Sequence, residues 1–245
     1  RRMSPANFSA RTTKQRLTHE TVLSMMNFLI DIDSQLLLFL NDCHTEYMDV
    51  FWRTFTGRFI WIPMYAALLV TVLRNCGWRR GLLSVAFVVL AIAVSDQYCG
   101  SVLRDCVGRL RPSNPDNPFS AMVQTVGGYR GGRFGFPSCH AANSFALATF
   151  CAMMQRSRRA GAFLVLWAVC NSYSRLYLGV HYPGDIFVGM VFGFLFGGLC
   201  YVASERVGAM RAYSDRPLVG RVRTSDLVII AGLATVAVIA VLPLF

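Results

Sequence analysis

The chain alternates long apolar stretches with short polar ones, which is the pattern of helices that cross a membrane. A helix needs about 20 mainly apolar residues to span the hydrocarbon core of a bilayer. By this measure the sequence predicts five clear spans, at about residues 59–74, 81–103, 141–155, 160–176 and 184–203. The pattern therefore predicts an all-α fold, a polytopic membrane helix bundle.

Two further stretches predict weaker spans. Residues 22–40 are apolar but contain Asp31 and Asp33, so this helix is expected either to face the bundle or to lie partly in the membrane interface. Residues 227–244 are apolar throughout and predict an extra C-terminal transmembrane helix. The bundle then consists of a six-helix core with one added helix.

The chain shows no internal repeat, low-complexity tract or linker that would divide the membrane region. The predicted organisation is an N-terminal cytoplasmic segment (1–21), a membrane domain (22–203), a basic cytoplasmic loop (204–226) and a C-terminal helix (227–245). No cleavable signal peptide is predicted, so the first helix is expected to direct membrane insertion. The longest connection, residues 105–137, is rich in Pro, Gly and Arg and is expected to carry function.

Composition excludes several classes of protein. Of the 245 residues, 54% are hydrophobic and 15% charged, and the mean hydropathy of +0.44 is too high for a soluble globular enzyme. The net charge of +11 would suggest nucleic acid in a soluble protein, but no aromatic and basic stripe is present, so no nucleic-acid partner is expected. The eight cysteines form no CxxC pair, which argues against a zinc or redox motif.

The distribution of basic residues predicts the orientation of the bundle. If all seven helices cross, roughly two thirds of the 24 basic residues lie on the side of the N-terminus, which is therefore cytoplasmic. The opposite side holds the remaining arginines: Arg53, Arg58, Arg104, Arg109, Arg111, Arg130, Arg133 and Arg175.

Three stretches on that opposite side are unusually polar for their surroundings. They are Arg104-x6-Arg111-Pro112, Pro137-Ser138-Cys139-His140 and Ser174-Arg175-x5-His181-x3-Asp185. Distant parts of the chain thereby meet at one end of the bundle. Three arginines beside helix N-termini are a receptor for a phosphate dianion, because forked N–H donors match its oxygens.

The two histidines predict a division of labour in hydrolysis. His181 and Asp185 are four residues apart at the start of a helix that Pro183 can begin, so the carboxylate can reach one imidazole nitrogen. The other nitrogen is then free to attack phosphorus. His140, at the head of another span, is the expected acid that protonates the leaving alkoxide.

These stretches resemble the three-part signature of the type 2 phosphatidic acid phosphatase superfamily, whose members include membrane lipid phosphatases. The family pattern is Lys-x6-Arg-Pro, then Pro-Ser-Gly-His, then Ser-Arg-x5-His-x3-Asp, and the match runs from Arg104 to Asp185. With its flanking helices, the resemblance covers residues 59–203.

The resemblance implies a role for each matched residue. It implies that His181 forms a phosphohistidine, that Asp185 orients it and that His140 is the general acid. The implied substrate-binding residues are Arg104, Arg111, Ser138, Cys139 and Arg175. No metal and no cofactor are expected.

Two positions depart from the family pattern. Arg104 stands where the family usually has Lys and keeps the charge with a longer, forked side chain. Cys139 replaces Gly, which puts a side chain close to the site and would be strained if the backbone needed a glycine geometry.

Other polar residues have simpler interpretations. Arg53, Arg58 and Arg109 are expected to anchor lipid headgroups, and Asp96 to make a structural hydrogen bond to a neighbouring helix. The glycine-rich stretch with Arg130 and Arg133 fits either ordinary loop charges or contacts to a substrate headgroup. No role is expected for His19 and His44. The Cys200-x5-Arg206 spacing, which resembles that of cysteine-dependent phosphatases, is predicted to be a helix end and is rejected.

The sequence thus favours a bacterial inner-membrane, multi-pass lipid phosphatase with its site on the periplasmic or outer face. The expected partners are the bilayer and a lipid phosphate, with lipid A, phosphatidylglycerophosphate and undecaprenyl diphosphate as candidates; the sequence makes no prediction of oligomeric state. The alternative is a transporter or flippase of an anionic lipid, which would need the positive charges but not the His-x3-Asp pair. A soluble haloperoxidase-like enzyme conflicts with the apolar spans.

Overall fold

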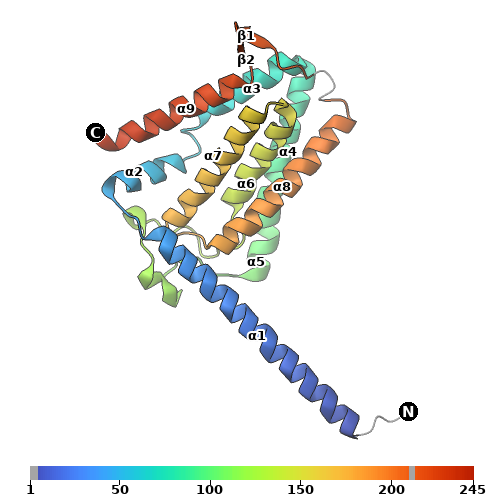
Figure 1. Ribbon diagram of the computed structural model, residues 1–245, viewed down its shortest axis with the longest axis vertical. Helices are drawn as coiled ribbons and strands as arrows, with labels where there is room; N and C mark the ends of the chain where they lie inside the picture. Colours follow the sequence, from blue (N-terminus) through green and yellow to red (C-terminus); the bar gives the residue numbers. More distant parts are fainter. Residues whose placement is uncertain (1–4, 210–212) are drawn as a thin grey trace.

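The protein is a bundle of helices in the computed structural model (Figure 1). The structure describes residues 5–209 and 213–245, with side chains from residue 20 onward. The α-helices are α1 (Pro5–Asn41), α2 (Glu46–Phe55), α3 (Ile62–Cys76), α4 (Trp78–Gln97), α5 (Arg104–Val107), α6 (Cys139–Gln155), α7 (Arg158–Tyr177), α8 (Pro183–Arg206) and α9 (Asp226–Val241). The shorter elements are η1 (Tyr98–Leu103), η2 (Pro118–Met122), η3 (Val126–Gly128), η4 (Leu242–Leu244), and the strands β1 (Pro217–Val219) and β2 (Val222–Arg223). The predicted all-α fold is confirmed.

Local sequence signals explain where the central helices begin. The Ser138 side chain accepts a hydrogen bond from the backbone N–H of Ala141 and caps α6, and Ser157 caps α7 in the same way. Pro183 is the first residue of α8, as predicted.

The helix that carries the first motif does not end where the sequence predicted. The expected span 81–103 begins earlier and continues through Val107, because the π-helical segment η1 joins α4 to α5 without a break. A π-helical turn shifts the direction of the side chains that follow it, and such turns are frequent at functional sites. Here the turn immediately precedes Arg104.

Length and hydropathy mark four helices as membrane spans in the described part of the chain: Glu20–Asn41, Trp78–Val107, Pro183–Arg206 and Asp226–Leu244. The helix Ile62–Cys76 is apolar but shorter. Helices α6 and α7 confirm that residues 141–155 and 160–176 are helical, but these two helices fall outside the set marked by hydropathy. They lie at the centre of the bundle, where Ala, Ser and Asn can replace the larger apolar residues that face lipid.

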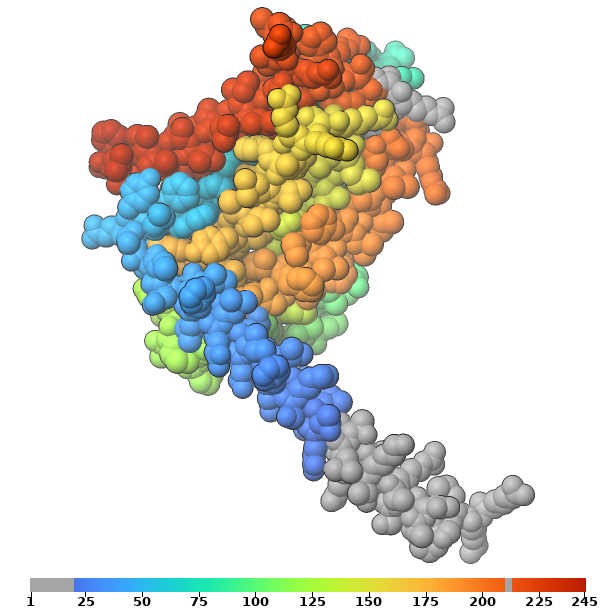
Figure 2. All heavy atoms as spheres, in the orientation of Figure 1, coloured from blue at the N-terminus to red at the C-terminus, as the bar shows by residue number. Residues whose placement is uncertain are grey.

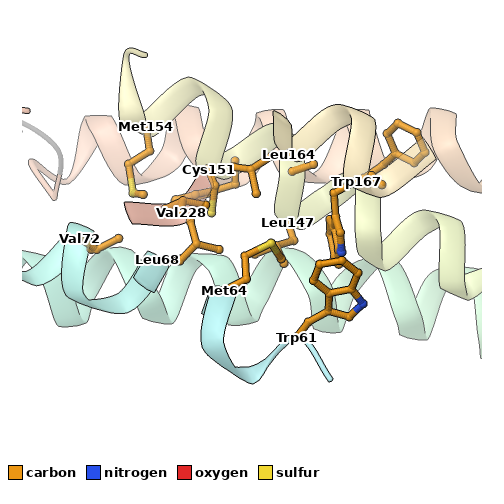
Figure 3. Packing of buried hydrophobic residues seen from close by; sticks show 14 of the residues in the cluster. Trp61, Met64, Leu68, Val72, Leu147, Cys151, Met154, Leu164, Trp167 and Val228 are labelled. Atoms are coloured by element: carbon orange, nitrogen blue, oxygen red, sulfur yellow. The ribbon is translucent and has the colours of Figure 1, made fainter. Parts of the chain in front are cut away.

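The apolar core lies between α3, α6 and α7. Trp61, Met64 and Leu68 point from the start of α3 toward Leu147 of α6 and Trp167 of α7 (Figure 3). All five side chains are buried. Their packing fixes the positions of three helices relative to one another, and two of these, α6 and α7, carry residues of the predicted site.

The most extensive helix contact among the described residues joins α6 to α8. Three glycines one turn apart on α8 face α6: Gly189, Gly193 and Gly197. A Cβ on Gly193 would lie 2.6 Å from the backbone oxygen of Ala142 and 2.6 Å from the Cβ of Phe145. Glycine is therefore required for the close approach of the two helices that carry His140 and Asp185.

Helix α1 contacts the bundle only near its C-terminal end. It packs against α7 and α8 and then extends away from the bundle (Figures 1 and 2). Asn41, its last residue, is buried, and its amide donates to the backbone oxygen of Tyr177 over 2.7 Å. Between residues 20 and 36 the helix is almost wholly exposed. The predicted alternative in which residues 22–40 face the bundle therefore applies only to the last part of this segment.

The C-terminal region adds a helix and a feature that the sequence did not predict. Helix α9 packs on α3, so the expected extra C-terminal span is confirmed as a helix of suitable length and hydropathy. The predicted basic loop 204–226 contains the small antiparallel hairpin of β1 and β2. The turn between these strands contains Gly220, whose φ of +57° favours glycine.

The glycine contact between α6 and α8 yields a stability prediction. Gly193→Leu is expected to lower the stability of the protein by about 1–3 kcal/mol or more, because backbone atoms of α6 occupy the space that the new side chain needs. The matched control is Gly198→Leu, since nothing lies within 4 Å of a Cβ at Gly198. Thermal unfolding in detergent measures the difference, and equal transition temperatures for the two variants would contradict the assignment.

Candidate functional site

The three polar stretches converge at one end of the bundle. Arg104 begins α5, Cys139 and His140 begin α6, and Arg175 lies in the last turn of α7. The loop after α7 contributes His181, and the first turn of α8 contributes Asp185. The prediction that these segments meet is confirmed by direct contacts between them.

His181 lies between a carboxylate and a guanidinium. Its Nδ1 is 3.3 Å from Asp185 Oδ2, and its Nε2 is 2.9 Å from Nη1 of Arg111. A guanidinium can only donate, so Nε2 accepts this hydrogen bond and the ring proton resides on Nδ1, where it is donated to Asp185. The contacts therefore define the tautomer that the His-x3-Asp spacing predicted, with the lone pair of Nε2 facing the arginines.

The three predicted arginines surround this imidazole with donors. Arg111 and Arg175 are buried, and Arg104 is half-buried. The Nε atom of each of the three is buried and has no hydrogen-bond partner among the described residues. Buried N–H donors are normally paired, because an unpaired one costs about 1–3 kcal/mol. An oxyanion bound at this site could accept hydrogen bonds from all three donors.

His140 is linked to this cluster through a residue that the sequence did not single out. Its Nε2 lies 3.2 Å from the hydroxyl oxygen of Thr56, which also accepts a hydrogen bond from Nη1 of Arg175 over 3.0 Å. Thr56 follows directly after α2, far in sequence from the three motifs. A lone threonine at the end of a short amphipathic helix gave no sequence signal for this contact.

The two departures from the family pattern contact each other. Nη2 of Arg104 donates to Cys139 Sγ over 2.8 Å and to the backbone oxygen of Pro137 over 3.3 Å. Cys139 is helical, and among the described residues the non-glycine residue with positive φ is Arg156. The expected side chain close to the site is therefore present, whereas the strain that a glycine-only geometry would impose is not.

Arg109 was wrongly predicted to be a lipid-headgroup anchor. Its Nη1 donates to Asp185 Oδ1 over 3.0 Å, and its Nη2 donates to Asp33 Oδ2 over 2.7 Å. Its guanidinium also stacks on the ring of Tyr182 at 3.9 Å. A buried carboxylate needs a nearby cation, and here Arg109 provides it. Arg109 thus belongs to the site, together with Asp33 of α1.

Several other predicted residues lie outside this cluster. Asp96 accepts a hydrogen bond from the amide of Asn143 on α6 over 2.8 Å, which confirms its structural interpretation. Arg130 is exposed and donates to the backbone oxygen of Ser113, and Arg133 lies over the ring of Phe134.

The remaining residues also lie outside the cluster. Arg53, in the last turn of α2, and Arg58, just after this helix, are both exposed. Arg206 is exposed at the C-terminal end of α8, as expected for a helix end. His44 pairs with Asp49 and stacks on Tyr177. The side chain of His19 lies outside the described residues.

A cavity of about 680 Å³ adjoins the site. Thr56, Arg58 and His140 line one part of it. The rest is mainly apolar and is lined from α3, α4 and α6, among others by Leu69, Val72, Val85, Val88, Ile92, Leu147 and Cys151. The α6 lining extends from Cys139 to Cys151, which at the helical rise corresponds to about 18 Å. The site therefore combines a cationic end with a long apolar channel.

The electrostatic surroundings keep the buried groups in defined protonation states. Burial lowers the pKa of His181 well below its ordinary value of 6.5, and the neighbouring charges of Arg111 and Arg175 lower it further. Burial and the charges of Arg104 and Arg175 lower the pKa of Arg111 to about 10, so that its guanidinium is still charged at neutral pH. A neutral imidazole beside charged guanidiniums has the chemistry to act as a nucleophile on a bound anion. Within the described residues no group of three His, Cys, Asp or Glu side chains is placed to hold a metal ion.

The chain is similar to proteins of a known family. The model of the PAP2 superfamily matches residues 81–209. A lipid A 4'-phosphatase of Bacteroides thetaiotaomicron is 49% identical over 216 residues, which cover 87% of this chain and 96% of the relative.

Two solved structures are similar in fold. The crystal structure of Aquifex aeolicus LpxE superposes with a TM-score of 0.53 at 25% identity, covering 68% of this chain and 92% of that one. A PAP2-type phosphatidylglycerolphosphate phosphatase from Bacillus subtilis superposes with a TM-score of 0.57 at 19% identity, covering 74% and 88% of the two chains, which is evidence about the fold alone.

The surroundings of His181 yield a prediction about its protonation. Because its pKa is lowered, the ring is expected to stay neutral at about pH 5.5, where an ordinary histidine is mostly protonated. Arg111→Gln removes a neighbouring positive charge and is expected to raise the pKa of His181. The measurement is an NMR titration of ¹⁵N-histidine-labelled protein, with His181→Asn to assign the signal. A doubly protonated His181 at about pH 6 in the wild type would contradict this electrostatic picture.

Proposed function

This chain belongs to the PAP2 superfamily, and from this we propose that it removes a phosphate group from lipid A through a phosphohistidine intermediate on His181. The chain is a phosphoric ester hydrolase and a multi-pass membrane protein, as the sequence predicted. The observation that carries the proposed mechanism is the pair of hydrogen bonds that link His181 to Arg111 through Nε2 and to Asp185 through Nδ1.

The substrate proposal rests on similarity and on shape. The Bacteroides relative that is 49% identical is a lipid A 4'-phosphatase, and the match covers 87% of this chain and 96% of the relative. The combination of an arginine cluster with an adjoining apolar cavity also fits a phosphate carried at headgroup depth on a molecule with acyl chains. Among the three candidate lipids, lipid A is therefore the proposed substrate.

The first chemical step uses the free nitrogen of His181. Nε2 attacks phosphorus, and the bond between phosphorus and the lipid oxygen breaks. The proton on Nδ1 stays on the ring, held by Asp185, which stabilises the positive charge that develops on the imidazole. His140, protonated once the bound phosphate anion offsets the arginine charges, gives its proton to the departing lipid alkoxide and becomes neutral. In the second step His140 takes a proton from water, the water oxygen attacks phosphorus, and inorganic phosphate and His181 are released.

The arginines supply most of the proposed catalysis. In the resting site Arg111 donates to the nucleophilic nitrogen, so it must transfer this hydrogen bond to the phosphate when substrate binds. The unpaired Nε donors of Arg104, Arg111 and Arg175 are then available to the equatorial oxygens of the transferring group. Ser138 and Cys139 complete the proposed phosphate pocket at the N-terminus of α6, where the helix dipole also favours an anion.

The proposed orientation places the site on the outer face of a bacterial inner membrane. More of the described basic residues lie in segments at the opposite end of the bundle, including the loops between α3 and α4 and between α6 and α7, than at the end that carries the site. We assign residues 22–203 to the phosphatase domain, with 1–21 and 204–226 as cytoplasmic segments and 227–245 as an additional membrane helix.

The apolar cavity is the proposed site for an acyl chain of the substrate. It extends from His140 along α3, α4 and α6, so a lipid whose phosphate lies on the arginines would place a chain in it. Each buried methylene group contributes about 0.8 kcal/mol of binding free energy before losses of mobility are counted. Long-chain substrates are therefore expected to bind better than short-chain ones.

The mechanism predicts the effect of removing the nucleophile or its partner. His181→Ala is expected to reduce phosphate release from lipid A by at least about a thousandfold, and Asp185→Asn by at least about a hundredfold. The measurement is release of inorganic phosphate by purified protein in detergent micelles or vesicles.

A second histidine–aspartate pair provides a matched control for that experiment. His44 Nδ1 lies 2.8 Å from Asp49 Oδ1, away from the arginine cluster, so His44→Ala and Asp49→Asn are expected to keep the activity. Phosphate release is also expected to persist in a chelator and to be inhibited by orthovanadate. Unchanged release in both His181→Ala and Asp185→Asn would contradict the proposed mechanism.

The cavity predicts a dependence on acyl chain length. Val88→Trp fills the cavity and is expected to raise the KM for long-chain lipid phosphates by about tenfold, with little change for a water-soluble phosphate monoester. Val89→Trp is the control, because the neighbouring Val89 is 59% exposed on the outer surface of α4. The same response of both variants to chain length would rule out this cavity as the acyl site.

A further inference from the structure

The geometry points to Asp33 and Arg109 as positioning residues that hold the carboxylate of Asp185 in place for His181. We call this ion pair the Asp33–Arg109 clamp. Neither residue is part of the motif positions to which the sequence assigned a role in the reaction. The inference rests on the proposed function in taking His181 as the nucleophile that Asp185 orients.

Arg109 joins two carboxylates with its two terminal nitrogens. Nη2 donates to Asp33 Oδ2 over 2.7 Å, and Nη1 donates to Asp185 Oδ1 over 3.0 Å. The guanidinium plane is held against the ring of Tyr182, 3.9 Å from its centroid. A forked donor whose plane is fixed by stacking can set the direction of a bound carboxylate, which a flexible ammonium group cannot do.

Asp33 is itself tied to the start of α8. Its Oδ1 accepts a hydrogen bond of 2.7 Å from the backbone N–H of Gly184, one of the N–H groups left without a partner in the first turn of a helix. A Cβ on Gly184 would lie 3.0 Å from Asp33 Oδ2, so glycine lets the carboxylate approach this closely. Asp33 thus holds Arg109 at a fixed position relative to the helix that carries Asp185.

The oxygens of Asp185 are divided between these partners. Oδ1 is taken by Arg109, while Oδ2 accepts the backbone N–H of Tyr182 over 3.0 Å and faces His181 Nδ1 at 3.3 Å. The carboxylate is completely buried. Rotation of Asp185 would break the bond to Arg109, so the clamp keeps Oδ2 directed at the imidazole.

The clamp also balances charge behind the nucleophile. His181 is faced by Arg104 of α5, Arg111 of the following loop, His140 of α6 and Arg175 of α7, and by the carboxylate of Asp185. Arg109 adds another positive charge next to Asp185, and Asp33 offsets it. Loss of Asp33 alone therefore makes the surroundings of His181 more positive, whereas loss of Arg109 alone makes them more negative.

The alternative is that Asp33 only anchors α1 to the bundle. Helix α1 is also held without Asp33, because Asn41, at the end of α1, donates to the backbone oxygens of Tyr177 and Gln124. Asp33→Asn also retains an oxygen that can accept from Gly184. The substitution is therefore expected to change the clamp without releasing α1.

The test compares Asp33→Asn, Arg109→Met and the double variant in full-length protein. The two single variants are expected to lower kcat for phosphate release by about tenfold to a hundredfold, with KM within about threefold of the wild type, because the phosphate-binding arginines are unchanged. The double variant is expected to be no slower than Arg109→Met, since both substitutions disable one unit. The matched control is Asp31→Asn, which removes an exposed carboxylate two residues away on α1 and is expected to behave as the wild type.

A second readout distinguishes positioning from a purely structural role. In the NMR titration of His181 without substrate, Asp33→Asn is expected to lower the pKa and Arg109→Met to raise it, with the shifts largely cancelling in the double variant. Shifts in the same direction, or Asp33→Asn activity equal to that of Asp31→Asn, would overturn the clamp. Absence of phosphate release from the wild type would instead refute the proposed function, and the titration would still decide on the clamp.

Discussion

The site depends on the confinement of several positive charges around one neutral imidazole. Arg111 and Arg175 are buried, and Arg104 is half-buried beside them, so their charges are poorly screened and repel one another. Only a rigid frame can hold such a cluster together, and the helix bundle provides it. Burial, together with the positive charges of Arg111 and Arg175, lowers the pKa of His181 and favours the unprotonated ring that the proposed mechanism requires. A phosphate dianion bound as proposed would offset the excess positive charge, so the same arrangement of arginines would serve both the proposed phosphate site and the proposed nucleophile.

The frame owes its rigidity to close helix packing at the point where the motifs meet. The glycines of α8 let it approach the backbone of α6, and the aromatic and aliphatic core between α3, α6 and α7 holds the third motif-bearing helix. Polar residues then occupy helix ends, where Ser138 caps α6 and Asp185 lies in the first turn of α8. Helix geometry thereby converts distant sequence positions into neighbours, while the polar atoms remain at one end of an otherwise apolar bundle.

Two residues that became important only in the tertiary structure share a common property. Asp33 lies in an apolar helix with few contacts to the bundle, and Thr56 lies just beyond a short helix near the first core residues. Each bonds to an arginine, Arg109 and Arg175 respectively. The sequence marked Asp33 as a carboxylate in an apolar helix but gave no partner for it, and the lone hydroxyl of Thr56 has no spacing partner along the chain. Arg109 was misassigned for the same reason, because its two carboxylate partners come from α1 and α8.

The class of fold and the helical segments could be predicted from the sequence, because apolar periodicity is a local property. The motif spacing, through its family resemblance, also grouped His181, Asp185, Arg111 and Arg175. The sequence also indicated the contact of Asp96 with a neighbouring helix. Contacts between helices were needed to show which helices are central, where α1 lies, how Cys139 contacts Arg104, and which groups surround Asp185. These features depend on which surfaces of separate helices come into contact, and such contacts are set by packing between residues far apart in the chain.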